Sequence, residues 1–154
     1  DFGQLQEWSE ARELDWYLLR EDNHRHLQEF YKDLLHLYKS YPALYANDEG
    51  YEGFEWINAD DCFRSIFSFI RKSPTKRKNL LFVINFTPMA RDDYRVGVPR
   101  NKQYKLILDS KDPKYGGPQI EKPKIYKAEK SECDGRPFSF AYPLPPYGVA
   151  VFEY

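Results

Sequence analysis

The sequence has 154 residues, a length that corresponds to one domain or slightly more. Its 23 basic and 24 acidic side chains leave a formal net charge of −1, which lacks the basic excess typical of nucleic-acid-binding proteins. No stretch approaches the roughly 18 apolar residues of a membrane span, and the first residues do not have the pattern of a signal peptide. We therefore expect neither nucleic acid nor membrane among its partners. The sequence starts at Asp1 and its only methionine is Met89, so we expect a segment of a longer protein.

Cysteine and aromatic content add two further constraints. Cys62 and Cys133 are too few and too far apart for a disulfide framework, which favours reduced thiols in a cytoplasmic protein. Aromatic residues make up 18% of the chain. Such rings fill cores but also stack on sugars and bases, and composition does not distinguish these uses.

The first part of the chain predicts a helical arm. Residues Asp1–Asp22 are polar and predict a loop that leads into a short helical turn around Leu14–Leu19. Asn23–Ser40 predicts a helix with Asn23 as its N-cap and Pro42 marking its end. Its apolar residues recur at spacings of three and four, as one buried face requires: Leu27, Phe30, Tyr31, Leu34, Leu35 and Tyr38.

Short apolar runs separated by turn residues follow this helix and predict a β domain. The expected strands are Phe54–Asn58, Ser65–Arg71, Leu80–Thr87, Tyr94–Val98, Tyr104–Leu108, Phe138–Tyr142 and Val149–Phe152. Lys122–Lys130 is rich in lysine and predicts a long surface loop. About seven short strands indicate an antiparallel sandwich or barrel.

The chemistry-bearing residues do not form a recognisable catalytic motif. A retaining glycoside-cleaving site needs two carboxylates about 5 Å apart on rigid supports. The adjacent pairs Asp60-Asp61 and Asp92-Asp93 lie in expected turns, where neighbouring side chains point apart, so we interpret both as turn residues. The three histidines lack metal-ligand spacing. The basic tract Arg71–Lys78 lies between two expected strands and is interpreted as a solvated hairpin loop.

A series of short motifs resembles one enzyme family. In chain order the motifs are Asp1-Phe2-Gly3-Gln4 with Glu7-Trp8 and Leu14-Asp15-Trp16, Pro42-Ala43-Leu44, Gly53-Phe54-Glu55-Trp56-Ile57, Ser65-Ile66-Phe67-Ser68-Phe69, Asn85-Phe86-Thr87-Pro88, Tyr94-Arg95-Val96-Gly97-Val98-Pro99, Tyr115-Gly116-Gly117 and Leu144-Pro145-Pro146. Together they resemble the C-terminal part of bacterial 1,4-α-glucan (glycogen) branching enzymes, members of the α-amylase superfamily. The resemblance covers essentially the whole chain.

This resemblance implies a mainly β fold with two parts. Residues 1–45 would be the last loop and helices of a catalytic (β/α)8 barrel, and residues 46–154 would be a C-terminal antiparallel β-sandwich. The parent enzyme would cleave an α-1,4 glucan by a retaining double displacement and transfer the chain to a 6-hydroxyl, without a metal or organic cofactor. The family's catalytic carboxylates belong to earlier barrel strands, so we expect no catalytic residue in this chain, which alone would be inactive. Its partners would be α-1,4-glucan chains and the barrel domain.

Four residues are the candidates for glucan contact. In the resembling family the loop from Gln4 to Trp8 follows the last barrel strand, so Trp8 would stack on a glucose ring while Gln4 and Glu7 hydrogen-bond to hydroxyls. Tyr115 lies beside two glycines in an expected turn and would offer an exposed ring. The alternative interpretation of Trp8 and Tyr115 is packing. Trp16 is interpreted as a packing anchor, and Trp56 as a core residue of a short strand.

Two other functions remain open at this point. The same architecture occurs in other glucan-active relatives, such as amylases and debranching enzymes, although the Glu7-Trp8 and Leu14-Asp15-Trp16 spacing favours branching enzymes. A stand-alone carbohydrate-binding module is the third possibility. The helix Asn23–Ser40 speaks against it, because this helix resembles the remnant of a neighbouring domain.

Overall fold

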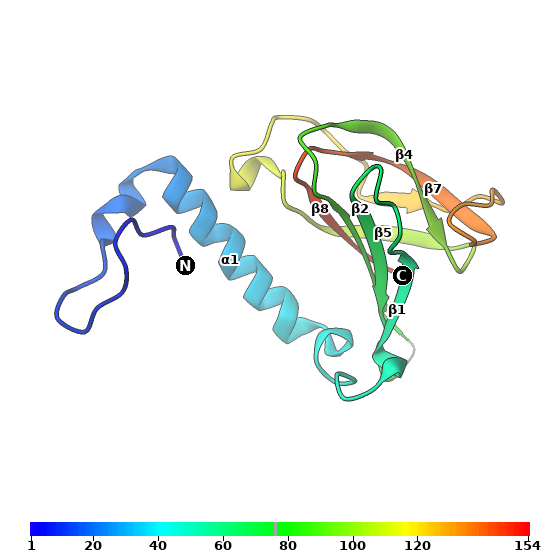
Figure 1. The fold of residues 1–154 in the computed structure, drawn as a ribbon, viewed down its shortest axis with the longest axis horizontal. Helices are drawn as coiled ribbons and strands as arrows, with labels where there is room; N and C mark the ends of the chain where they lie inside the picture. The colour runs from blue at the N-terminus through cyan, green and yellow to red at the C-terminus, as the bar shows by residue number, and fades with distance from the viewer. Residues whose placement is uncertain (76) are drawn as a thin grey trace.

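A computed structural model describes residues 1–75 and 77–154, which form a helical arm followed by a β-sandwich (Figure 1). The helices are η1 (Trp16–Arg20), α1 (Asp22–Ser40), η2 (Pro42–Leu44), η3 (Tyr51–Gly53) and η4 (Pro113–Tyr115). The strands are β1 (Phe54–Asn58), β2 (Ile66–Arg71), β3 (Leu80–Asn85), β4 (Arg91–Val98), β5 (Gln103–Asp109), β6 (Ile125–Lys127), β7 (Phe138–Leu144) and β8 (Val149–Glu153).

The strands form two antiparallel sheets that enclose the main core. The larger sheet has the order β1-β2-β3-β8-β5-β6, and β4 pairs with β7 in the smaller sheet. Alternate residues of β2, Ile66, Ser68 and Ile70, are buried on the inner face. They meet apolar residues of the smaller sheet such as Val96 and Phe140. The period of two along each strand therefore places one face in the core and the other outside it.

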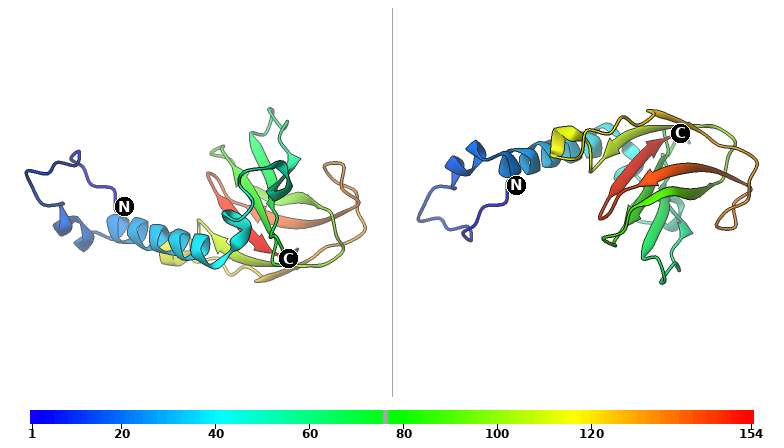
Figure 2. Two further views of the ribbon diagram at one scale, coloured as in Figure 1. Left: turned by 90° about the horizontal axis from the view of Figure 1, so that it is seen from below. Right: turned by 90° about the horizontal axis from the view of Figure 1, so that it is seen from above.

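The arm covers part of the outer face of the larger sheet. Phe30, Leu34 and Leu37 of α1 pack against a second cluster that contains Leu108 of β5 and Val151 of β8. The N-terminal half of α1, with η1 and the first loop, extends beyond the sandwich (Figures 1 and 2). The arm is thus held by one helical face.

Polar contacts fasten the base of the arm to the sandwich. The hydroxyl of Tyr41 donates to the Glu153 carboxylate at 2.6 Å. The guanidinium of Arg71, at the end of β2, donates to the carbonyls of Ala43 and Leu44 at 3.1 and 3.3 Å and pairs with Asp48. These bonds satisfy carbonyl groups at the end of η2, which would otherwise lack partners.

The helix, the short helical turn and all seven expected strands are confirmed, but four details differ. Lys122–Lys130 is not all loop, because β6 lies within it and Tyr126 is buried there. Asp92-Asp93 lies in an irregular part of β4 rather than in a turn. The N-cap position is Glu21 instead of Asn23, since Asp22 already belongs to the first turn. Trp56, expected in the core, is 49% exposed because it faces outward from β1.

Two of the connections expected from the sequence are present, at Asp61 and between β2 and β3. Asp61 does form a turn, in which its carboxylate accepts the backbone N–H of Arg64 at 3.2 Å. The basic tract connects β2 to β3 as expected, and its residue Lys76 lies outside the described residues.

Among the described helices, none combines the length and the apolar character that crossing a membrane requires.

Candidate functional site

The first loop is anchored to the arm by aromatic and polar contacts. Phe2 is buried and its ring stacks on Trp16 with 5.3 Å between centroids. The Phe2 carbonyl lies 2.8 Å from Nδ1 of His24. Gly3 has a φ of +71°, a left-handed conformation that glycine adopts without strain. These contacts fold the loop back against the start of α1.

Gln4, one of the predicted sugar-contacting residues, helps to hold this loop in place. Its Oε1 accepts the backbone N–H of Asp15 at 2.9 Å, and its Nε2 donates to the carbonyl of Gln6 at 2.8 Å. Both ends of the amide are therefore engaged within the protein. A sugar hydroxyl would have to share these groups.

Trp8 and Gln4 line a shallow cavity of about 500 Å³ together with Trp16. The indole of Trp8 is 67% exposed, so its ring is accessible. Glu7 is exposed and does not line this cavity; its carbonyl accepts from the guanidinium of Arg12 at 2.6 Å. The structure thus brings together two of the three residues predicted for this loop.

Tyr115 lies apart from that loop, on η4 above the middle of α1. Its hydroxyl donates to the Asp33 carboxylate at 2.5 Å, and Phe30 meets its ring edge-on at 5.0 Å between centroids. Nζ of Lys114 lies 4.7 Å from the ring centroid and 2.7 Å from the Asp33 carboxylate. The ring is therefore half-buried and fastens the 110–117 loop to the arm.

Electrostatics at Tyr115 agree with this fastening role. Hydrogen bonds from Lys114 and Tyr115 lower the pKa of the Asp33 carboxyl. Burial, together with the hydrogen bond to Asp33, raises the pKa of Tyr115 to about 12. The adjacent Gly116 has a φ of +82° that ends η4, and a Cβ there would lie 2.8 Å from Nδ1 of His26. A glycine is required for this close approach to the arm.

A third feature was not expected from the sequence, and we call it the aromatic ridge. It consists of six rings on the outer face of β1, β2 and β3 and just beyond: Phe54, Trp56, Phe67, Phe69, Phe82 and Phe86. Phe69 is opposite Trp56 in one strand pair and opposite Phe82 in the next. Phe69 and Phe82 stack with 4.8 Å between centroids and an interplanar angle of 8°.

The ridge is covered at one end and open at the other. Phe82 packs against the cluster beneath α1, whereas Trp56 is 49% exposed and Phe86 is 59% exposed. Phe54 and Phe69 meet the Trp56 indole at 4.9 and 5.7 Å between centroids. The indole is thus held by neighbouring rings while much of its surface remains accessible, an arrangement suited to stacking on an apolar ligand face. Alternating aromatics at Phe54/Trp56 and Phe67/Phe69 were the signal in the sequence.

Neither of the adjacent carboxylate pairs considered in the sequence, Asp60-Asp61 and Asp92-Asp93, is arranged for acid–base chemistry. Asp61 pairs with Arg64 at 2.5 Å, and Asp92 and Asp93 are exposed on β4. Within residues 1–75 and 77–154, no group of three or more His, Cys, Asp or Glu side chains is arranged to hold a metal ion. Both cysteines are free thiols. What the site offers is aromatic and hydrogen-bonding surface.

Comparison with known proteins assigns the β part of the chain. Residues 56–154 match the family described as the alpha amylase C-terminal all-beta domain. The chain is 49% identical over 154 residues to a protein of Butyrivibrio fibrisolvens named 1,4-alpha-glucan branching enzyme GlgB, with 100% of this chain and 24% of that protein covered. Proteins of the same name from Marinobacter nauticus and Aquifex aeolicus are 42% and 38% identical, covering 99% and 100% of this chain and 24% of each relative. The chain spans about a quarter of the length of these relatives.

Proposed function

Because this chain belongs to the family of alpha-amylase C-terminal all-beta domains, we propose that it is the C-terminal region of a glycogen branching enzyme. The names of its relatives and their identity over the full length of this chain support the proposal. The enzyme would cleave an α-1,4 glucan through a covalent glycosyl-enzyme intermediate and pass the chain to a 6-hydroxyl. The two free thiols are compatible with a cytoplasmic location.

Catalysis would reside in a barrel domain of the same polypeptide, and residues 1–45 would pack on that barrel. The exposed side of α1 supports this role, because four apolar side chains lie there between 37% and 60% exposed: Leu27, Tyr31, Leu35 and Tyr38. Such a continuous apolar stripe normally lies against a partner. The sandwich covers the neighbouring face of the helix, through Phe30, Leu34 and Leu37, so one helix would join the two domains.

The second role is glucan contact, and the exposed Trp56 at the open end of the aromatic ridge is the observation that carries it. An indole held by three neighbouring rings and about half open offers a flat surface for the apolar face of a glucose unit. Trp8, with Gln4 and Glu7, would add contacts at the far end of the arm, where a barrel would complete the site. Tyr115 would contribute only the exposed part of its ring.

The experiment is a titration of the 154-residue chain with maltoheptaose, followed by heteronuclear NMR. The chain offers a matched set of tryptophans, since Trp8, Trp16 and Trp56 are 67%, 52% and 49% exposed. We expect shifts around Trp56 and a loss of affinity of about tenfold in Trp56→Ala, the effect of roughly 1.4 kcal/mol. Tyr17→Ala serves as the control, because its ring is 59% exposed but belongs neither to the aromatic ridge nor to the cavity beside Trp8.

Two results would contradict parts of this proposal. If an excess of maltoheptaose shifts the signals of none of the three tryptophans, the chain does not contact glucan and serves only as a scaffold. For the enzyme itself, the longer protein should form α-1,6 bonds from linear α-1,4 glucan. Release of short sugars without new branches would instead indicate an amylase or debranching enzyme.

The barrel-packing role has a separate test in the isolated chain. We expect the stripe on α1 to drive concentration-dependent self-association in sedimentation experiments. The double variant Leu35→Lys/Tyr38→Lys should remain monomeric, because both side chains are exposed and the packed side of the helix is untouched. A wild-type monomer at all concentrations would contradict the exposed-stripe idea.

A further inference from the structure

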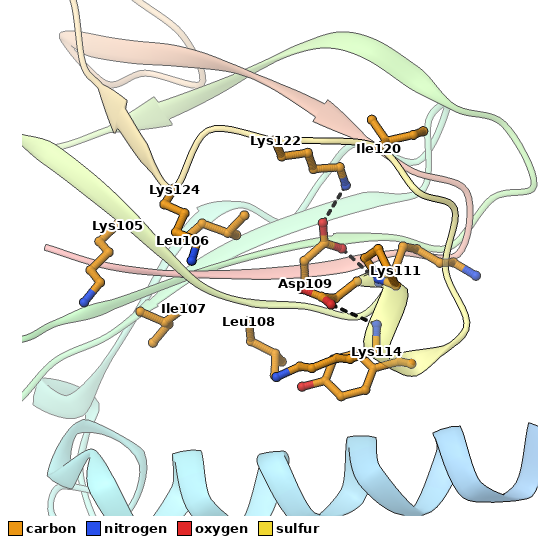
Figure 3. Close-up of a pocket in the computed structure, with 13 residues that line it drawn as sticks. Lys105, Leu106, Ile107, Leu108, Asp109, Lys111, Lys114, Ile120, Lys122 and Lys124 are labelled. Carbon is orange, nitrogen blue, oxygen red and sulfur yellow. Dashed lines mark hydrogen bonds and ion pairs between the residues drawn. The ribbon is translucent and has the colours of Figure 1, made fainter. Parts of the chain in front are cut away.

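A cavity of about 400 Å³ lies between β5, η4 and the loop that leads to β6 (Figure 3). Its apolar wall is formed by Leu106, Ile107 and Leu108 of β5, and Ile120 lies on the opposite side. Five lysines also line it: Lys105, Lys111, Lys114, Lys122 and Lys124. The edge of β5 is accessible here because β6 pairs with it only over residues 103–105.

One carboxylate at the cavity, that of Asp109, is fully engaged. Asp109 is 7% exposed, and its Oδ2 accepts from Nζ of Lys122 at 2.5 Å and from the Tyr142 hydroxyl at 3.1 Å. Its Oδ1 accepts the backbone N–H of Lys111 at 2.9 Å. A paired and hydrogen-bonded carboxylate of this kind orders the cavity wall and leaves the neighbouring ammonium groups uncompensated.

The remaining lysines have few acidic neighbours. Lys114 pairs with Asp33, whereas Lys105, Lys111 and Lys124 make no ion pair within the described parts of the chain. Figure 3 shows Lys105 and Lys124 at one end of the cavity and Lys111 at the other. Among the described residues two acids, Asp109 and Asp112, line the cavity, and Asp33 compensates Lys114, so the five lysines leave a formal charge of +2 there. The whole chain carries −1, so this concentration of positive charge is local.

We propose that this cavity binds a phosphate monoester borne on a sugar-sized molecule. A volume of about 400 Å³ is typical of small-molecule sites rather than of polymer grooves. Lysine ammonium groups bind phosphate as point charges, and a phosphate monoester carries about two negative charges at neutral pH, which suits the local excess better than a single carboxylate. The apolar wall of β5 would contact the carbon skeleton. The ligand would be either a free sugar phosphate or a phosphate group carried on a glucan chain.

The test is isothermal titration of the 154-residue chain with glucose 6-phosphate, and separately with a phosphorylated maltodextrin. We expect saturable binding that weakens as salt is raised. Lys105→Gln/Lys124→Gln should lower the affinity at least tenfold, because each lysine contributes a charge-assisted hydrogen bond. Lys127→Gln/Lys130→Gln removes the same charge from exposed positions outside the cavity and should change the affinity less than twofold.

The possible results distinguish a free sugar phosphate from a chain-borne phosphate, and both from general charge attraction. Binding of glucose 6-phosphate identifies a free sugar phosphate, and binding of the phosphorylated dextrin alone identifies a chain-borne phosphate. Equal losses in both double variants would show general charge attraction and overturn the site. Absence of saturation with both probes at millimolar concentration would overturn it as well. Neither result would bear on neutral maltoheptaose, which we assign to the aromatic ridge.

Discussion

The larger sheet carries aromatic clusters on both of its faces, and the two clusters differ in what covers them. On the inner face Phe152 meets Tyr126, Phe140 and Tyr142 with centroids 5.2 to 5.6 Å apart, and these rings are almost fully buried. On the outer face the aromatic ridge has similar spacings but ends in exposed rings. The same residue types therefore serve stability where a second sheet covers them and become available to a ligand where it does not.

Alkaline pH should destabilise the protein more than any single substitution below, because it acts on several buried tyrosines of the inner cluster. Burial raises the pKa of Tyr104 and Tyr142 above the ordinary value of about 10, and raises that of Tyr126 to about 12. A raised pKa means that the folded state favours the protonated phenol, so this contribution to stability is complete below about pH 10 and is lost as pH rises through the folded-state pKa. We expect the protein to unfold, as followed by circular dichroism, when these buried tyrosines ionise, as followed by ultraviolet absorbance. Full tyrosine ionisation of a still folded protein would contradict this.

Phe152→Ala should have the next largest effect. Truncation of a fully buried ring at the centre of the inner cluster leaves a cavity and should lower the free energy of unfolding by about 3–5 kcal/mol. Urea denaturation of both proteins measures the difference. A loss below about 1 kcal/mol would show that the cluster does not support the sandwich.

Tyr142→Phe tests the polar end of the inner cluster. It removes the hydroxyl that donates to the buried Asp109 carboxylate at 3.1 Å and keeps the ring. We expect a loss of about 1.5–3 kcal/mol, the range for a hydrogen bond to a charged group. Tyr115→Phe is the comparison, since it removes a similar bond to Asp33 in a more exposed place and should cost less, about 1 kcal/mol. Equal losses would show that burial of the acceptor is unimportant.

Trp56→Ala should have the smallest effect on stability. The indole is half exposed and loses mainly its contacts with Phe54 and Phe69, so we expect about 1 kcal/mol or less. Thermal unfolding of this variant beside Phe152→Ala gives the comparison directly. A loss as large as that of Phe152→Ala would place Trp56 in the core after all.

The sequence predicted the helices and strands better than it predicted which face of each strand is covered. The helix and seven strands follow from hydrophobic periodicity, which is a local property. β6 was missed because Tyr126 is the one buried residue of a three-residue strand that follows Lys124 and ends at Lys127, too short for a period to show. Trp56 was misplaced because alternation separates two faces of a strand without telling which one is covered.

The candidate site was predicted only in part for the same reason. Trp8 and Gln4 line one cavity, and their contact with sugar stays a prediction. The engagement of Gln4 with Asp15 depends on the fold of the loop. The lysine cavity could not be predicted, because Lys105 and Lys124 come together only through the pairing of β5 with β6.

The position of β8 has a consequence for how the protein acquires its structure during synthesis. β8 comes last among the strands in chain order, yet it lies in the middle of the larger sheet between β3 and β5. Until the ribosome has released these residues, β1-β2-β3 and β5-β6 cannot join, and both would present unpaired strand edges to other nascent chains. Closure through such distant pairings is also slow. The synthesis of β8 is therefore the step that completes the sheet.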